Sequence, residues 1–105
     1  MDQAPGEAAR HLARRLIQSE ADFDDRLDLG FMLCTAHPAD ALARDVMKET
    51  YLAQLPVFQG DHEAALALIS AGESERDESL DAAEHATWTV LASMILNLDE
   101  TLTRE

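Results

Sequence analysis

The stretch of this chain closest to a known catalytic pattern begins like a zinc site. His62 and Glu63 start the pattern His-Glu-x-x-His, in which two histidines on one helix face bind zinc and the glutamate is the general base. Position 66 is leucine, so the second histidine is missing. No stretch has the Glu-x-x-His spacing of di-iron bundles either. We therefore predict no metal-ligating residue on this helix.

Two further acid–histidine pairs have the four-residue spacing of neighbours on a helix, namely Glu7 with His11 and Asp81 with His85. Either pair could in principle contribute to a metal site, but surface ion pairs and capping are the ordinary roles of this spacing.

Cys34 is the only cysteine, which excludes an internal disulfide and a multi-thiolate metal site. It lies in an apolar run, so we expect a small buried side chain.

Other catalytic and cofactor motifs are missing from the sequence. The four glycines are isolated, so there is no phosphate-binding loop, and a single cysteine excludes the Cys-x-x-Cys-His motif that attaches haem. Serine, histidine and aspartate occur at no spacing that indicates a catalytic triad. We therefore predict no catalytic, cofactor-binding or metal residues and no cofactor, and we expect no enzyme activity from this chain alone.

The chain is strongly acidic. Its 105 residues include 21 acidic and eight basic side chains, a formal charge of −13, which repels polyanions and argues against nucleic-acid binding. Residues 61–105 hold 11 of the acids and only two of the bases.

No segment has the roughly 18 apolar residues of a membrane span. We expect no signal peptide at residues 1–20, because arginines interrupt the apolar positions.

Apolar residues recur every three or four positions through most of the chain. This spacing predicts an all-α fold, a compact bundle of about five helices without a sheet. A length of 105 residues is typical of one domain. The chain contains only four glycines and three prolines, the residues that most often interrupt helices. The expected helices cover residues 5–19, 24–36, 39–55, 62–70 and 82–97, with an acidic loop at 73–81.

Prolines and aspartates determine the expected helix boundaries. His37-Pro38 should end the second helix, since the residue before a proline avoids the helical conformation. Pro56 lacks a backbone N–H and is expected to stop or kink the third helix after Leu55. Asp61 and Asp81 are the expected N-caps of the fourth and last helices.

The last helix has the widest apolar face, which predicts a central position in the bundle. Its candidate residues are Trp88, Leu91, Ile95 and Leu98, as core anchors or as an interface. Gly30 is unfavourable inside a helix by about 1 kcal/mol relative to alanine, and therefore indicates close helix packing. The other expected core positions are Ala9, Leu12, Ala13, Leu16 and Ile17, then Phe23, Leu27, Phe31 and Cys34 flanked by Met32 and Leu33, and then Leu42, Val46, Met47, Tyr51, Leu52 and Leu55, whereas Arg10, Arg14, Arg15 and Gln18 should face water.

Three stretches resemble a known family: Phe31-Met-Leu-Cys-Thr-Ala-His-Pro38, the segment from Gly72 to Asp81, and above all Trp88-Thr-Val-Leu-Ala-Ser-Met-Ile-Leu-Asn-Leu-Asp-Glu-Thr101. The chain resembles the C-terminal domain of unknown function of large planctomycete proteins that also carry planctomycete-type cytochrome c domains. It differs in having His37 where that family has arginine, and Pro56 within a usually longer helix. The resemblance implies the tail of an exported or periplasmic multidomain parent associated with electron transfer. It implies no haem site and no catalytic residue in this chain.

Three functions follow as hypotheses. The first is a non-catalytic helical packing or protein-interaction module that binds other domains of a parent protein or a second copy of itself. The second is a fragment of an enzyme whose active site is completed by upstream domains, which requires His37, His62 or His85 to meet acids in one cleft. The third is a small-ligand or metal-binding helical bundle. The sequence itself carries no signal that specifies a cellular location.

Overall fold

Five helices account for the described part of the chain in the computed structural model, which describes residues 5–69 and 81–104 and the side chains of 8–69 and 81–98. They are α1 (Pro5–Ser19), α2 (Phe23–Thr35), α3 (Ala41–Gly60), α4 (His62–Ile69) and α5 (Ala82–Arg104). No strand occurs among these residues, which confirms the predicted all-α bundle. Of the expected loop at 73–81, only Asp81 lies within the described residues.

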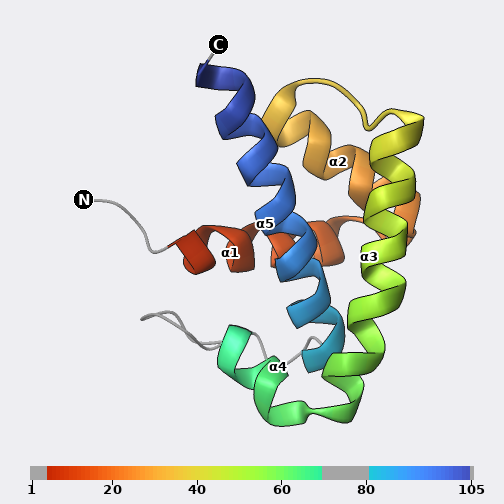
Figure 1. Cartoon of the computed structure of the whole chain (residues 1–105), viewed down its shortest axis with the longest axis vertical. Coiled ribbons are helices and arrows are strands. Elements are labelled where there is room, and N and C mark those ends of the chain that lie inside the picture. The colour runs from red at the N-terminus through yellow and green to blue at the C-terminus, as the bar shows by residue number, and fades with distance from the viewer. Residues whose placement is uncertain (1–4, 70–80, 105) are drawn as a thin grey trace.

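Helix α5 is the central element of the bundle. It contacts each of the other four helices, most extensively α1. Figure 1 shows α1 crossing α5, whereas α3 runs alongside it and α2 and α4 lie near its two ends. The wide apolar face of the last helix is therefore explained by the number of helices that pack on it.

The core consists of two clusters joined by α5. The main cluster contains the inner faces of α1 and α2 together with Trp88, Leu91 and Ile95. Its buried members are Ala9, Ala13, Leu16, Leu27, Phe31, Ala39, Met47, Trp88, Leu91, Ala92 and Ile95. The smaller cluster joins the end of α3, α4 and the start of α5 through Phe58, Ala65, Ile69, Ala82, Ala83 and Ala86.

Three helices begin at an aspartate that caps their first turn. The carboxylates of Asp40, Asp61 and Asp81 each accept the backbone N–H three residues further on, at 2.8, 3.1 and 3.0 Å. This bond satisfies one of the N–H groups that a helix N-terminus leaves without a partner. The expected caps at Asp61 and Asp81 are confirmed.

Helix α3 continues through Pro56 to Gly60, so the expected end at Leu55 is wrong. Proline lacks one N–H but keeps a helical φ, so it weakens a helix only locally. The turn after it carries Phe58, which is buried against α4 and the start of α5. Burial of this ring offsets the missing hydrogen bond and holds the last turn in place.

Helix α5 is also longer than expected, extending to Arg104 rather than ending near Asn97. The added segment contains neither glycine nor proline, so nothing in it forces the helix to end. Among the described residues, none of the helices combines the length and the hydropathy that a membrane crossing needs.

Several side chains expected in the core are instead exposed. On α3 the large apolar side chains that are covered form one stripe, Met47, Tyr51, Leu55 and Phe58. The exposed side chains are Leu42, Val46 and Leu52 on α3, Met32 and Leu33 on α2, and Leu98 on α5. Helices α2 and α3 each pack on α5 and on one further helix, α1 for α2 and α4 for α3, and the rest of their surface stays open.

Arg10 departs from expectation in the opposite direction, because its side chain is only 3% exposed. Helix α1 makes the largest contact with α5, and the stripe that it buries is wider than its apolar positions. The backbone oxygen of Arg10 also lies 3.2 Å from Nε2 of the buried His85. Arg14, Arg15 and Gln18 face water as predicted.

Candidate interaction site between α2, α3 and α5

An open groove of about 610 Å³ lies where the end of α2, the start of α3 and the second half of α5 meet. Its lining is mainly apolar, and we refer to it below as the apolar groove. The α2 side and the following corner contribute Phe31, Thr35, His37, Pro38 and Asp40. The two long helices contribute Leu42, Ala43, Val46 and Met47 from α3 and Met94, Asn97 and Leu98 from α5.

Helical spacing explains how the walls arise. Leu42 and Val46 lie one turn apart on α3, and Met94 and Leu98 lie one turn apart on α5. These pairs flank the covered stripes of their helices, so their side chains border the groove. Met94 also packs against the main cluster. Phe31 and Met47 are buried beneath them. The groove is therefore a gap between packed helices with an apolar floor and apolar walls.

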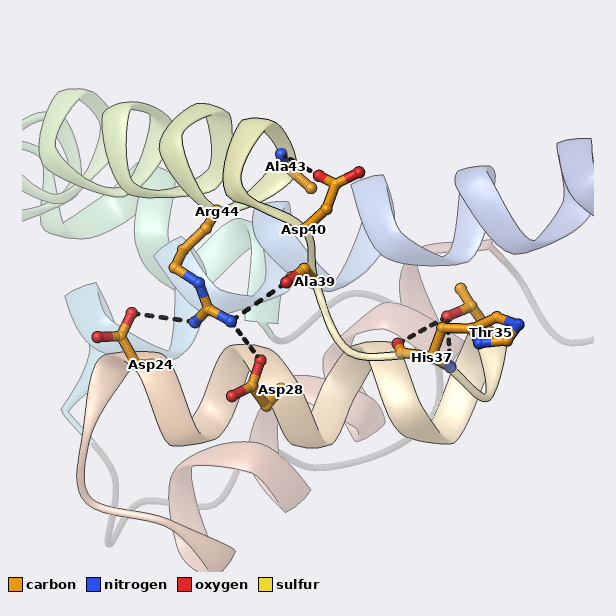
Figure 2. A network of polar contacts seen from close by, with 8 residues as sticks. All are labelled: Asp24, Asp28, Thr35, His37, Ala39, Asp40, Ala43 and Arg44. Atoms are coloured by element: carbon orange, nitrogen blue, oxygen red, sulfur yellow. Dashed lines mark hydrogen bonds and ion pairs between the residues drawn. The ribbon is translucent and has the colours of Figure 1, made fainter.

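The corner between α2 and α3 is held by local hydrogen bonds. Ala36 adopts a left-handed conformation (φ 66°), and its N–H bonds the carbonyl oxygen of Met32 at 3.1 Å. The Thr35 hydroxyl accepts the N–H of His37 at 3.2 Å and lies 2.7 Å from the oxygen of Phe31. Figure 2 shows this turn beside the capped start of α3. These hydrogen bonds fix the backbone of the corner, which forms one edge of the apolar groove.

Arg44 connects the same corner to the middle of α2. Its Nη2 donates to Asp28 Oδ1 at 2.7 Å and to the carbonyl oxygen of Ala39 at 3.2 Å, and its Nη1 donates to Asp24 Oδ1 at 3.2 Å (Figure 2). The hydrogen bond to Asp28 is the main reason why the pKa of Arg44 lies above its ordinary value. The Arg44 side chain therefore connects α3 to α2, and the carboxylates of Asp24 and Asp28 neutralise its charge.

A second cluster, polar and partly buried, lies beside Trp88. Tyr51 donates a short hydrogen bond to Glu84 Oε2, and Arg26 Nη1 lies 3.5 Å from Glu84 Oε1. Arg26 also donates to the carbonyl oxygen of Glu20 at 2.7 Å, at the C-terminal end of α1. A hollow of about 450 Å³ borders this cluster. These contacts connect Arg26 of α2 with Tyr51 of α3, Glu84 of α5 and the C-terminal end of α1.

Alkaline titration of Tyr51 tests this second cluster. Burial, and then the hydrogen bond to Glu84, raises the pKa of Tyr51 from 10.0 to about 12. Because the pKa is raised on folding, Tyr51 contributes a stabilisation of the folded state that is complete below pH 10. This contribution is lost as the pH rises toward 12. Since Tyr51 is the only tyrosine, phenolate absorbance in the near ultraviolet should report a native midpoint near 12. If the midpoint of the native protein equals that in denaturant, the buried hydrogen bond between Tyr51 and Glu84 is contradicted. The variant Glu84→Gln should lower the native midpoint.

Three of the four candidate residues of the last helix belong to the core. Trp88, Leu91 and Ile95 are fully buried, whereas Leu98 is 42% exposed and borders the apolar groove. The apolar face around Trp88 is therefore covered within the chain itself. An interface can include Leu98 but not these three buried side chains.

The histidines named for an enzyme site do not meet. His37 borders the apolar groove, whereas His62 begins α4, beyond the opposite end of α3. Because α3 has 20 residues, about 30 Å of helix separates the two. His85 is buried against α1. No group of three metal-ligating side chains occurs among the residues that the structure describes.

The expected pairs give no shared ligand site in the described side chains. Asp81 caps α5 through the N–H of Glu84, four residues from the buried ring of His85. Glu7, the expected partner of His11, lies outside the described side chains. Cys34 is half-buried against the main cluster rather than fully buried.

Sequence reasoning missed Arg44 and the groove-bordering role of Leu42 and Val46. Arg44 pairs with acids that lie 16 and 20 residues earlier, and spacing rules do not reach across separate helices. A weak indication of a special role for Arg44 was available in the sequence, because it is the only arginine between positions 26 and 76. Leu42 and Val46 were placed in the core because their spacing is the same as that of truly buried residues.

The chain matches no protein-family model, no curated protein and no solved structure. The resemblance to the planctomycete domain therefore stays a prediction.

Proposed function

We propose that this chain is a non-catalytic helical module that binds a protein segment in the apolar groove. The observation that carries this proposal is the exposure of large apolar side chains around one concave surface. Leu42 is 74% exposed, and Val46 and Leu98 are each 42% exposed. Contiguous exposed apolar patches of this kind commonly mark binding surfaces, and covering such side chains gains about 25 cal/mol per Å².

The arrangement favours binding over catalysis. Two polar groups at the groove already make structural bonds, since Asp40 caps α3 and the Thr35 hydroxyl accepts the N–H of His37. The three histidines named as candidates in the enzyme hypothesis lie on separate parts of the fold. As part of this proposal, the bound segment belongs to another domain of a larger parent protein, as the family resemblance implies.

Methyl NMR of the four methionines tests the proposal. The ligands are helical peptides with leucines on one face, in three versions with glutamine, lysine or glutamate on the flanking positions. We expect at least one version to shift the Met47 and Met94 methyl signals, because both side chains border the groove, and to leave Met32 unchanged, because it lies outside the lining. If no version shifts these two signals, the proposed function is wrong.

A matched pair of variants shows where the peptide binds. Leu42→Asp should weaken binding about tenfold or more, because burial of one leucine is worth about 1.5–3 kcal/mol. Leu52→Asp changes another exposed leucine of α3 that does not border the groove, and should leave affinity unchanged. Both variants should unfold within about 0.5 kcal/mol of the parent chain, as expected for surface positions. Equal weakening by both would place the site elsewhere.

A further inference from the structure

We infer that the occupant of the apolar groove is a basic amphipathic helix, with an apolar stripe flanked by lysine or arginine. This inference rests on the proposed function and specifies its partner. Two observations carry it: the shape of the groove between two helices, and the acidic side chains along its outer rim.

The shape favours a helix as the bound segment. One wall is a one-turn stripe on α3, Leu42 and Val46, and the other is a one-turn stripe on α5, Met94 and Leu98. A third helix can lay the ridge formed by its own i, i+4 side chains between two such stripes. This is the helix-in-groove mode of recognition, in which anchors at i, i+3, i+4 and i+7 supply the apolar contact.

The rim of the groove is acidic. Asp45 and Glu49 are exposed on α3, one position before and three positions after Val46, so helical periodicity places them along the outer edge of the Leu42–Val46 stripe. Asp40 borders the groove itself, and its lining contains no lysine or arginine. Lys48 follows Asp45 by three positions, on the side of Asp45 that faces away from the groove.

The charge of the whole chain acts in the same direction. The formal net charge is −13, and Arg44, which follows the lining residue Ala43, is already bonded to Asp24 and Asp28. A basic partner would gain complementary charge at the rim and a faster encounter. A second copy of this chain would bring two such rims and two charges of −13 together, so we commit to a basic helix rather than to self-association.

The peptides with lysine, glutamine or glutamate flanks provide the direct test, by titration calorimetry at low salt and at about 0.5 M salt. We expect the lysine version to bind at least about tenfold more tightly than the glutamine version at low salt, and the glutamate version to bind most weakly. High salt should narrow these differences, since exposed charges are screened. Equal affinity of the three versions would overturn this inference while leaving the proposed function intact.

Charge reversal on the rim locates the effect. The double variant Asp45→Lys and Glu49→Lys should remove the preference for lysine flanks, with the glutamine version bound as before. The matched control, Asp25→Lys with Glu63→Lys, makes the same change in net charge at exposed positions of α2 and α4 outside the groove, and should keep most of the preference. Equal losses in the two double variants would overturn a rim-specific role.

Light scattering at two protein concentrations tests the competing occupant. We expect a monomer at both concentrations. A dimer whose formation shifts the Met47 and Met94 signals, and which excludes the lysine peptide, would show that a second copy occupies the groove and would overturn the inference.

Discussion

Replacing Trp88 with alanine is expected to lower the free energy of unfolding by about 3–5 kcal/mol. The side chain is fully buried, and its ring centroid lies 5.3 Å from that of Phe23 and 6.0 Å from that of Tyr51. Removal leaves a cavity and loses these aromatic contacts. Because small domains are stable by only about 5–15 kcal/mol, this change alone can remove a large part of the total.

Urea unfolding followed by far-ultraviolet circular dichroism measures the effect. Tryptophan fluorescence cannot serve, since Trp88 is the only tryptophan. Trp88→Phe is the conservative control and should lose less stability, because the indole Nε1 has no hydrogen-bond partner among the described residues. Leu42→Ala, at an exposed position, should change stability by no more than about 0.5 kcal/mol. A loss below about 1 kcal/mol for Trp88→Ala would contradict a core role.

Replacing Gly30 with leucine is the second large effect, expected to destabilise the protein by about 1–3 kcal/mol or more. A Cβ atom at Gly30 would lie 3.0 Å from Ile95 Cδ1 and 3.1 Å from Leu16 Cδ1. Both neighbours are fully buried, so a longer side chain has no free space and must displace α1 or α5. This close approach explains why glycine is tolerated in the middle of α2 despite its poor helix propensity.

Gly60 is the matched control for this variant. A Cβ atom built there meets nothing within 4 Å, so Gly60→Leu should change the urea midpoint little. Gly30→Ala should have an intermediate effect, because the gain in helix propensity of about 1 kcal/mol opposes the tight contacts. An unchanged midpoint for Gly30→Leu would mean that α2 does not pack closely against Leu16 and Ile95.

Local rules were sufficient for much of the fold. The three-to-four-residue spacing of apolar positions predicted the helices and the range of α1, and the aspartates predicted the caps at 61 and 81. Close packing at Gly30 also followed from residue type and position, and a core position was one of the two roles expected for Trp88. These features depend on hydrogen bonds and sterics within a few residues, so a single sequence contains the information needed.

Other features depended on packing between helices. Helix α3 passes Pro56 because Phe58 is buried by α4 and α5, a contact that proline rules do not include. Arg44 joins acids on another helix, and Arg10 is buried because α1 packs closely on α5. In each case, a residue distant in sequence determines the outcome.

The candidate site shows the same division most clearly. The sequence by itself determined that Leu42, Val46 and Leu98 lie on apolar faces of their helices. Only the tertiary structure decided that no described helix covers them, and that they border one groove with His37 and Asp40. Periodicity specifies which side chains share a face of a helix, but the crossing of the helices decides which faces meet a neighbour and which remain open.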